Sequence, residues 1–341
     1  MKALSPARFA ATVTPFALFF LGALAICPLV GAVPLDLSRA LDFSADRAAN
    51  ADYQLLFVLR LPRALLAALT GSALAMAGAA FQALLRNPLA EPYTLGVSSG
   101  GALGAVLAIK LGLDITFAGL SSVPLFSFAG SLSAMGVIYL LARGRGRFPT
   151  SVLLLSGVTI SFFFASMILF IHYIADFTEN QQMIRWMMGG LDIVGFSAVM
   201  QVLPLWIVGA LAVLYLARDL NVLSFGDVYA SSKGIDVPRT QKGTFIFASM
   251  MTGAVVSAAG PIGFVGLIVP HALRFFTGPD LRVLAPASAL AGAGFLILCD
   301  TAARTILGSV EIPVGVLTAM LGGPFFLFLL MRHKRRLGAT D

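Results

Sequence analysis

The sequence predicts an all-α polytopic membrane protein of about ten transmembrane helices, with both termini in the cytoplasm. The first observation is composition: 58% of the 341 residues are hydrophobic, 11% are charged and the mean hydropathy is +0.92. Soluble domains carry about 25% charged residues, and a soluble chain of this length could not bury so much apolar surface. The second observation is the stretch GPIGFVGLIVPHALRF at residues 260–275, where Gly and Pro interrupt an apolar run. A bilayer tolerates such breaks where neighbouring helices satisfy the freed backbone groups.

Ten apolar stretches account for the predicted spans, since crossing the hydrocarbon core takes about 20 residues. They are residues 13–33, 64–84, 94–112, 123–142, 151–174, 197–217, 242–259, 262–277, 283–303 and 313–331. The eighth is short and broken. An even number of spans puts both termini on one side of the membrane. Most of the 23 Lys and Arg residues then fall on the cytoplasmic side, as the positive-inside rule requires.

The first span is predicted to stay in the protein. Ala25-Ile26-Cys27 resembles a lipoprotein cleavage site, but Ile26 is too large for the position before the cysteine, and the apolar run continues to Val33. The two cysteines, Cys27 and Cys299, both lie in apolar runs. They indicate neither a disulfide framework nor a metal site.

The polar segments between the spans are short. The longest are about 36–60 and 175–195 on the outer side and 218–241 on the inner side. None can bury a core of its own, so residues 1–341 are expected to form a single transmembrane domain. The net charge of +7 comes from small clusters between apolar runs, whereas a nucleic-acid-binding protein would gather its cations on one face.

Motifs for enzymatic chemistry are missing or out of context. The sequence has no GxxxxGK[ST] loop, so ATP would have to be bound by another polypeptide. The GVSSG run from Gly96 to Gly100 matches a hydrolase nucleophile elbow, but that motif needs a preceding strand and a triad. We interpret Gly96, Gly100 and Gly104 as the small-residue spacing that lets membrane helices approach closely. A membrane enzyme built on Ser98, with His271 as its base, is the rival hypothesis that this interpretation disfavours.

Asp300 is the acidic residue that best fits an ion-coupling role, because buried acids mark ion paths in carriers. It lies near the outer end of the ninth span, four residues before Arg304, which places both side chains on one helix face. We therefore interpret the two as a structural ion pair. The scarcity of buried charge disfavours the alternative function, an ion-coupled secondary transporter that works without an ATPase.

The inner loop contains a segment, residues 224–234, that is predicted to form a short helix. Ser224 would cap it, Asp227 would lie in its first turn and Gly234 would end it. An apolar side would face the cytoplasm, formed by Phe225, Val228 and Tyr229. Two interpretations stay open on the residues alone: a helix lying on lipid headgroups, or a docking element for a soluble partner.

Three arginines on the outer side run against the positive-inside trend. Arg60 and Arg63 precede the second span, and Arg304 follows the core of the ninth. They would either extend to lipid phosphates, as long cationic side chains do, or contact an acidic partner.

Five segments in this order resemble the permease subunits of binding-protein-dependent ABC importers for cobalamin, haem and ferric siderophores, the FecCD-type family. They are Arg60 to Arg63 leading into the second span, Asn87 to Pro92 with Leu95 to Ser98, Ser151 to Gly157, Gly260 to Leu267 with Pro270 and His271, and Glu311 to Gly315 with Leu321 to Phe325. Together they cover about residues 55–331.

The resemblance implies a type II ABC importer permease in a bacterial inner membrane. It implies a homodimer with the path on its two-fold axis, two cytoplasmic ATPase subunits that hold ATP and Mg, and a periplasmic substrate-binding protein. The chain itself would have no catalytic residue, cofactor or metal.

The resemblance also implies roles for individual residues. Arg60, Arg63 and Arg304 resemble arginines that meet acidic residues of the binding protein, for which bidentate guanidinium–carboxylate pairing is suited. The coupling segment, within residues 221–238, would seat in the ATPase cleft through Ser224, Phe225, Gly226, Asp227, Tyr229, Ala230 and Gly234. Asn87, Leu89, Thr150 and Ser151 resemble the cytoplasmic gate.

The implied substrate is a bulky metal chelate, moved by alternating access, and the sequence does not choose among haem, siderophore and cobalamin. The 12 Met and 27 Phe residues suit a smooth apolar conduit. His172 and Met183 are candidate haem ligands, although a single histidine near a helix end is more often structural.

Overall fold

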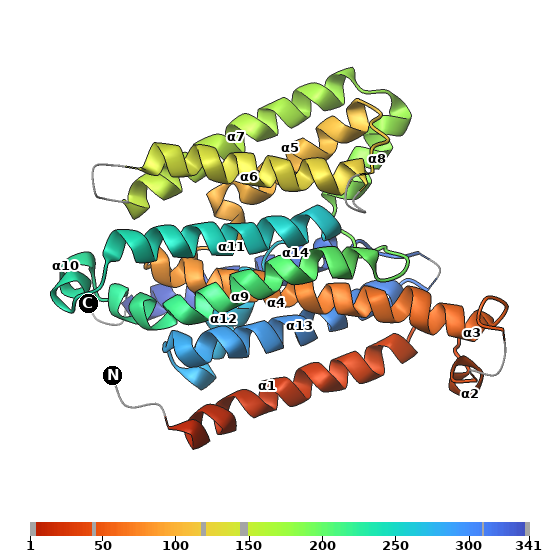
Figure 1. The fold of residues 1–341 in the computed structure, drawn as a ribbon, viewed down its shortest axis with the longest axis horizontal. Helices are drawn as coiled ribbons and strands as arrows, with labels where there is room; N and C mark the ends of the chain where they lie inside the picture. The colour runs from red at the N-terminus through yellow and green to blue at the C-terminus, as the bar shows by residue number, and fades with distance from the viewer. Residues whose placement is uncertain (1–4, 43–45, 117–120, 144–148, 309, 338–341) are drawn as a thin grey trace.

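The computed structural model describes residues 5–42, 46–116, 121–143, 149–308 and 310–337, and it is all-helical over these residues (Figure 1). The principal helices are α1 (Pro6–Ile26), α4 (Leu61–Leu84), α5 (Val97–Lys110), α6 (Ser122–Ala142), α7 (Thr150–Ile174), α9 (Ser197–Leu223), α11 (Val237–Ala259), α12 (Val265–Thr277), α13 (Leu281–Thr305) and α14 (Val314–Leu337). Shorter elements are η1 (Cys27–Leu29), α2 (Leu37–Ala40), α3 (Ala51–Tyr53), η2 (Gln54–Arg60), η3 (Pro92–Leu95), α8 (Phe177–Met187) and α10 (Asp227–Ser232).

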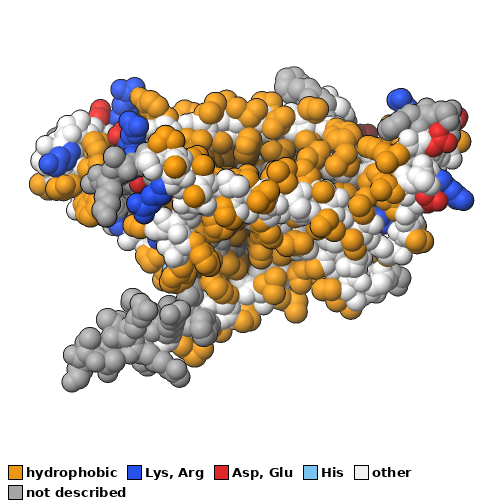
Figure 2. Space-filling view, turned by 90° about the horizontal axis from the view of Figure 1, so that it is seen from below, with side chains coloured by type: hydrophobic (Ala, Val, Ile, Leu, Met, Phe, Trp, Pro, Cys, Tyr) orange, Lys and Arg blue, Asp and Glu red, His pale blue; other side chains and the backbone are white. Residues whose placement is uncertain are grey.

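The predicted spans are confirmed as helices. Of the described helices, seven are long and apolar enough to cross a membrane, and the apolar parts of α5, α12 and α14 are shorter. In Figure 2, hydrophobic side chains cover the middle of the visible face, and charged side chains gather toward its two ends. This distribution fits a bundle whose sides contact lipid and whose ends meet water.

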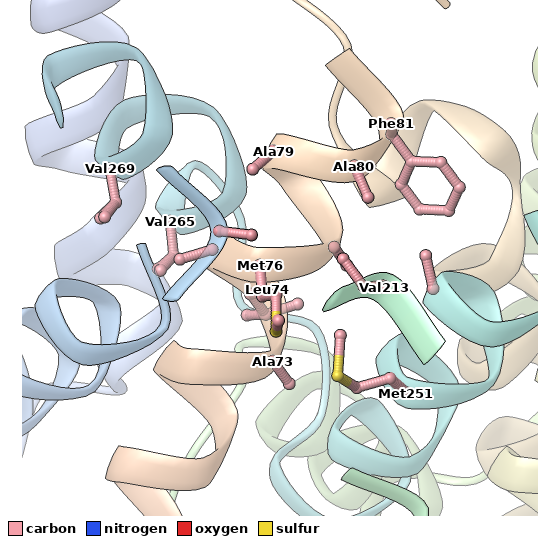
Figure 3. Close-up of a cluster of buried hydrophobic side chains, with 14 of the residues drawn as sticks. Ala73, Leu74, Met76, Ala79, Ala80, Phe81, Val213, Met251, Val265 and Val269 are labelled. Carbon is pink, nitrogen blue, oxygen red and sulfur yellow. The ribbon is translucent and has the colours of Figure 1, made fainter. Parts of the chain in front are cut away.

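Helix α4 lies at the centre of the bundle. It packs against α13, α11, α12 and α9, and Figure 3 shows Leu74 and Met76 of α4 among Val213 of α9, Met251 of α11 and Val265 of α12. Small residues permit this closeness, because association in lipid relies on packing contacts rather than on expulsion of water.

The predicted break in the eighth span is confirmed. Helix α11 ends at Ala259, residues 260–263 are non-helical, and α12 begins at Val265. Phe264, which caps α12, has a left-handed backbone with φ of 68°. Pro270 lies inside α12.

Two predicted boundaries were wrong. The first span begins at Pro6 and its helix ends at Ile26, because Pro28 follows and the chain continues as a 3₁₀ turn and a loop. The sixth span continues to Leu223, beyond the predicted residue 217. The polar residues near its end remain helical because Asn221 is bonded: its Nδ2 donates to Asp280 (2.7 Å) and its Oδ1 accepts from Leu281 N (2.8 Å).

The start of α1 and the end of α14 lie at the same end of the bundle as α10 (Figure 1). This arrangement agrees with an even number of spans. Three of the cations that favour cytoplasmic termini, Lys2, Arg145 and Arg147, lie outside the described residues, as do the side chains of residues 332–336.

The glycine stripe of α5 lies against α6, as predicted. A β-carbon at Gly100 would collide with the Gly130 carbonyl oxygen and would lie 2.6 Å from the Ala134 β-carbon, and one at Gly104 would collide with the Phe126 carbonyl oxygen. The two backbones therefore touch along the stripe. Gly96 differs: it has a φ of 74° and caps the start of α5.

Candidate functional site

An ion-pair cluster lies at the outer end of α4 and is centred on Arg63. Its Nε donates to Asp300 Oδ1 at 2.9 Å, and its Nη1 lies 2.8 Å from both Asp192 Oδ1 and Glu311 Oε2. Asp300 also accepts from Arg304 Nε at 3.1 Å, so the predicted pair on α13 is confirmed. The cluster joins α4 and α13 to the loops that follow α8 and precede α14.

The three predicted outer arginines differ in their surroundings. Arg60 is buried, and its guanidinium donates to the carbonyl oxygens of Pro28 (3.3 Å) and Val33 (2.5 Å). It therefore fixes the turn after α1. Arg304 is also buried, between Asp300 and Thr301.

Arg63 is the exception, because two of its partners face water. Its side chain is 14% exposed, whereas those of Asp192 and Glu311 are 70% and 53% exposed. A carboxylate from outside could therefore exchange with these two. Contact of all three arginines with a binding protein stays a prediction.

Two of the hollows in the described part of the chain meet at Met188. One, of about 340 Å³, is lined by Arg63, Arg185, Asp192 and Glu311 beside Met188. The other is shallow and open to the surface. It is lined by Tyr93, Met187, Met188, Val316 and Met320, and no charged side chain of the described residues lines it. The charged hollow thus adjoins an apolar, methionine-rich one at Met188.

At the inner end, α10 presents an apolar surface. Phe225 is 72% exposed and Val228 is 87% exposed, and the ring of Tyr229 lies 5.8 Å from that of Phe225. The predicted cap was wrong: Gly226 precedes α10, whereas Ser224 ends α9 and donates its Oγ proton to the Asn221 carbonyl oxygen. The helix is shorter than predicted because residues 224–226 form the turn that follows α9, with Gly226 at a φ of 120°. Gly234 follows α10 with a φ of 80°.

The residues predicted for the cytoplasmic gate lie in two places. Asn87 and Leu89 belong to the loop after α4, where Asn87 Oδ1 accepts from Leu89 N at 3.0 Å and Leu89 is exposed. Thr150 and Ser151 open α7, after Pro149. The gate assignment stays a prediction.

Three residues of these sites were missed from sequence. Asp192 and Glu311 pair with Arg63, and Arg86 pairs with Asp227 and donates its Nε to the Leu223 carbonyl oxygen at 3.0 Å. The available signal was charge: both acids lie in predicted outer loops that also carry the cations, and Arg86 directly precedes the gate segment.

Two candidate haem ligands are engaged within the chain. His172 Nδ1 lies 2.6 Å from Asn180 Oδ1, and Met183 is fully buried against Ile168 and Ile171. Ser98 is likewise buried, at the start of α5 and after a 3₁₀ turn. A nucleophile elbow would instead place it on a turn after a strand.

Known proteins are similar to this chain in sequence and in fold. A family model described as the FecCD transport family matches residues 17–332. The cobalamin import system permease protein BtuC of Halobacterium salinarum is 44% identical over 82% of this chain and 73% of its own length. The hemin transport system permease protein HmuU of Yersinia pestis is 39% identical over 82% of each chain.

A solved structure supports the same assignment. It is an inward-facing conformation of a chain assigned to the metal-chelate type of ABC transporter. It superposes with a TM-score of 0.80 and 26% identity, covering 95% of this chain and 99% of the other. In such transporters ATP is bound by a separate ATPase, so the membrane chain is not itself an enzyme. The chain belongs to the FecCD transport family and is a permease subunit of an ABC importer.

Proposed function

We propose that this chain, as a pair of identical copies, carries a bulky metal chelate such as haem, cobalamin or a ferric siderophore into the cell. The observation that carries the proposal is the methionine-lined hollow formed by Met187, Met188 and Met320. Methionine side chains are flexible and polarisable, and they suit large ligands of irregular shape. The names of the relatives that transport cobalamin and hemin point to the same class.

The same hollow supports a homodimer. Met320 is exposed and lines it, so the hollow reaches the surface of the chain. A second copy related by two-fold symmetry would cover it and create a closed conduit, in the self-complementary manner of such dimers.

The two ends of the chain suit the two soluble partners of an importer. At the outer end, Arg63 offers a guanidinium whose exposed partners can be exchanged for carboxylates of a binding protein. At the inner end, the apolar surface of α10 suits an ATPase cleft. We propose that ATP binding and hydrolysis move α10 and so drive alternating access.

The secondary-transporter alternative is weakened by Asp300, because its carboxylate already accepts from Arg63 and Arg304. The serine-enzyme alternative is weakened by the burial of Ser98.

The proposal is tested by uptake into proteoliposomes that contain the chain, its ATPase and its binding protein. Haem, cyanocobalamin and a ferric hydroxamate are supplied in turn, with and without ATP. We expect ATP-dependent uptake of one of the three. Transport by the chain alone down an ion gradient would overturn the proposal, and so would transport of a free metal ion in place of all three chelates.

A further inference from the structure

Arg86 occupies a backbone position that normally belongs to glycine. It follows the last turn of α4 with a φ of 50°, and the turn has the two bonds of a Schellman cap: Asn87 N donates to Gln82 O (3.1 Å) and Arg86 N donates to Ala83 O (3.3 Å). Only Arg86 and Phe264 among the described non-glycine residues have a positive φ. Such a conformation is unfavourable for a residue with a β-carbon, so the side chain is the feature to explain.

The Arg86 side chain bridges α4 to the turn between α9 and α10. Its Nε donates to the carbonyl oxygen of Leu223, the last residue of α9, at 3.0 Å. Its Nη2 pairs with the carboxylate of Asp227, the first residue of α10. One guanidinium therefore contacts both sides of the turn at Gly226, which has a φ of 120°.

The residues after Arg86 form the predicted gate loop. Asn87 follows directly, and its side chain accepts from Leu89 N at 3.0 Å. Ala90 N in turn donates to the Asn87 carbonyl oxygen at 3.1 Å. A displacement of α10 would therefore pull on Asp227, on the Arg86 guanidinium and then on a loop whose first residues are bonded to one another.

We propose that Arg86 is a positioning residue that transmits movement of α10 to the gate loop at Asn87–Leu89. The proposal rests on the proposed function, in which the ATPase moves α10. It adds a specific residue to that function: the pair between Arg86 and Asp227 is what makes gate movement follow ATPase movement. This link joins the end of α4 to the end of α9 and to the start of α10, so it is a contiguous bonded connection between α10 and the gate loop.

The decisive variant is Arg86→Gly. Glycine suits the left-handed backbone, so the fold should be kept or improved while the link is lost. With the importer reconstituted, we expect the melting temperature to stay at or above that of the parent and the ATPase still to co-purify. The amount of chelate imported per ATP hydrolysed should fall at least about fivefold, the lower end of typical coupling between sites.

Two further variants separate the link from a general effect of charge. Asp227→Asn should reduce coupling in the same direction, and the exchange Arg86→Asp with Asp227→Arg should restore part of it. Arg218→Gln is the matched control, because Arg218 is an exposed arginine near the same end of α9, and its coupling should equal that of the parent. Full coupling in a folded Arg86→Gly protein would overturn the inference.

A measurement on the chain alone distinguishes this inference from the proposed function. Cys27 and Cys299 are buried, so a nitroxide can be attached selectively to Leu89→Cys in nanodiscs. We expect the label to be more mobile when Arg86→Gly or Asp227→Asn is added, and unchanged with Arg218→Gln. Unchanged mobility with Arg86→Gly would refute the link, whatever the partner proteins do. Failure of the parent chain to bind any ATPase would refute the proposed function while leaving this result intact.

Discussion

Arg63 on α4 and Asp300 on α13 form an ion pair between two membrane-spanning helices, with Arg63 Nε 2.9 Å from Asp300 Oδ1. Asp300 is nearly completely buried and also holds Arg304. One carboxylate thus pairs with two guanidinium groups at the outer end of the bundle. The exposed acids Asp192 and Glu311 complete the charge balance around Arg63 from the surface.

Removal of the Asp300 charge is expected to destabilise the protein strongly. Asp300→Asn would leave two guanidinium groups without their shared buried counter-ion, a loss that costs about 3–5 kcal/mol in buried pairs. Glu311→Gln is the control, because its carboxylate is half exposed and such pairs contribute about 0–1 kcal/mol. Thermal unfolding of the purified variants measures both. Equal melting temperatures for the two variants would show that Asp300 is not an essential counter-ion of the cluster.

The exposed acids are expected to compete with the binding protein for Arg63. Arg63→Glu should weaken association with the binding protein, since close interfacial charge pairs couple by about 1.5–7 kcal/mol. The double variant Asp192→Asn with Glu311→Gln should strengthen it, because Arg63 is then free to accept an outside carboxylate. Binding measured at rising salt should weaken, since exposed charges are screened beyond about 8 Å at physiological ionic strength. Unchanged binding by a folded Arg63→Glu protein would leave Arg63 with a purely structural role.

The contact between α5 and α6 is expected to tolerate no side chain at Gly100. Gly100→Ala would press a β-carbon against Gly130 and Ala134, and overpacking typically costs about 1–3 kcal/mol. Gly136→Ala on α6 is the matched control: a β-carbon there has no neighbour within 4 Å, and alanine favours a helix over glycine by about 1 kcal/mol. The melting temperature should fall for the first and hold or rise for the second. Ser98→Ala should change neither stability nor uptake, and loss of uptake in a stable Ser98→Ala protein would revive the serine-enzyme hypothesis.

Much of this architecture was predictable because the lipid environment imposes it locally. Length and hydropathy predict each span, glycine spacing predicts that a neighbouring helix lies close against α5, and a four-residue interval predicts the pair between Asp300 and Arg304. The Gly and Pro residues of the 260–275 stretch likewise predict the break before α12.

The contacts that join distant segments were not predictable in this way. The partners of Arg63 on two outer loops, and the reach of Arg86 to Asp227, depend on the three-dimensional arrangement of helices and leave no periodic pattern. The sequence predicts the end of α9 too early, at residue 217, because the polar residues near Asn221 are typical of a loop. They are helical because the Asn221 side chain is bonded to Asp280 and to Leu281 N, which holds the end of α9 against the start of α13.

The ion pair at the start of α8 is expected to make stability depend on pH. Glu179 accepts from Lys110 Nζ at 2.8 Å and from Asp176 N at 2.9 Å, and the Lys110 hydrogen bond is the main cause that lowers the pKa of Glu179 below its ordinary 4.5. Because the carboxyl pKa is lower in the folded chain, its stabilising contribution is present above pH 4.5 and is lost as the pH falls through the folded pKa.

Glu179→Gln should therefore lower the melting temperature at neutral pH, and the difference from the parent should shrink as the pH falls below 4.5. Asp176→Asn is the control, because asparagine caps a helix about as well as aspartate and leaves the Glu179 carboxylate in place. Its pH dependence should follow that of the parent. A pH-independent difference for Glu179→Gln would mean that the Lys110 pair contributes nothing.

The apolar surface of α10 is expected to be the attachment point for the ATPase. Phe225 and Val228 are highly exposed at the cytoplasmic end, and a hydrophobic anchor seated in a partner's pocket typically dominates the energy of an interface. Phe225→Asp and Val228→Asp should each abolish co-purification of the ATPase, because a carboxylate would be buried without a partner. Phe225→Leu is the conservative control and should keep most of the binding. Each variant should remain folded in the membrane, because neither side chain packs within the bundle. If the ATPase co-purified equally with Phe225→Asp, Val228→Asp and the parent, α10 would instead be a helix lying on the lipid headgroups.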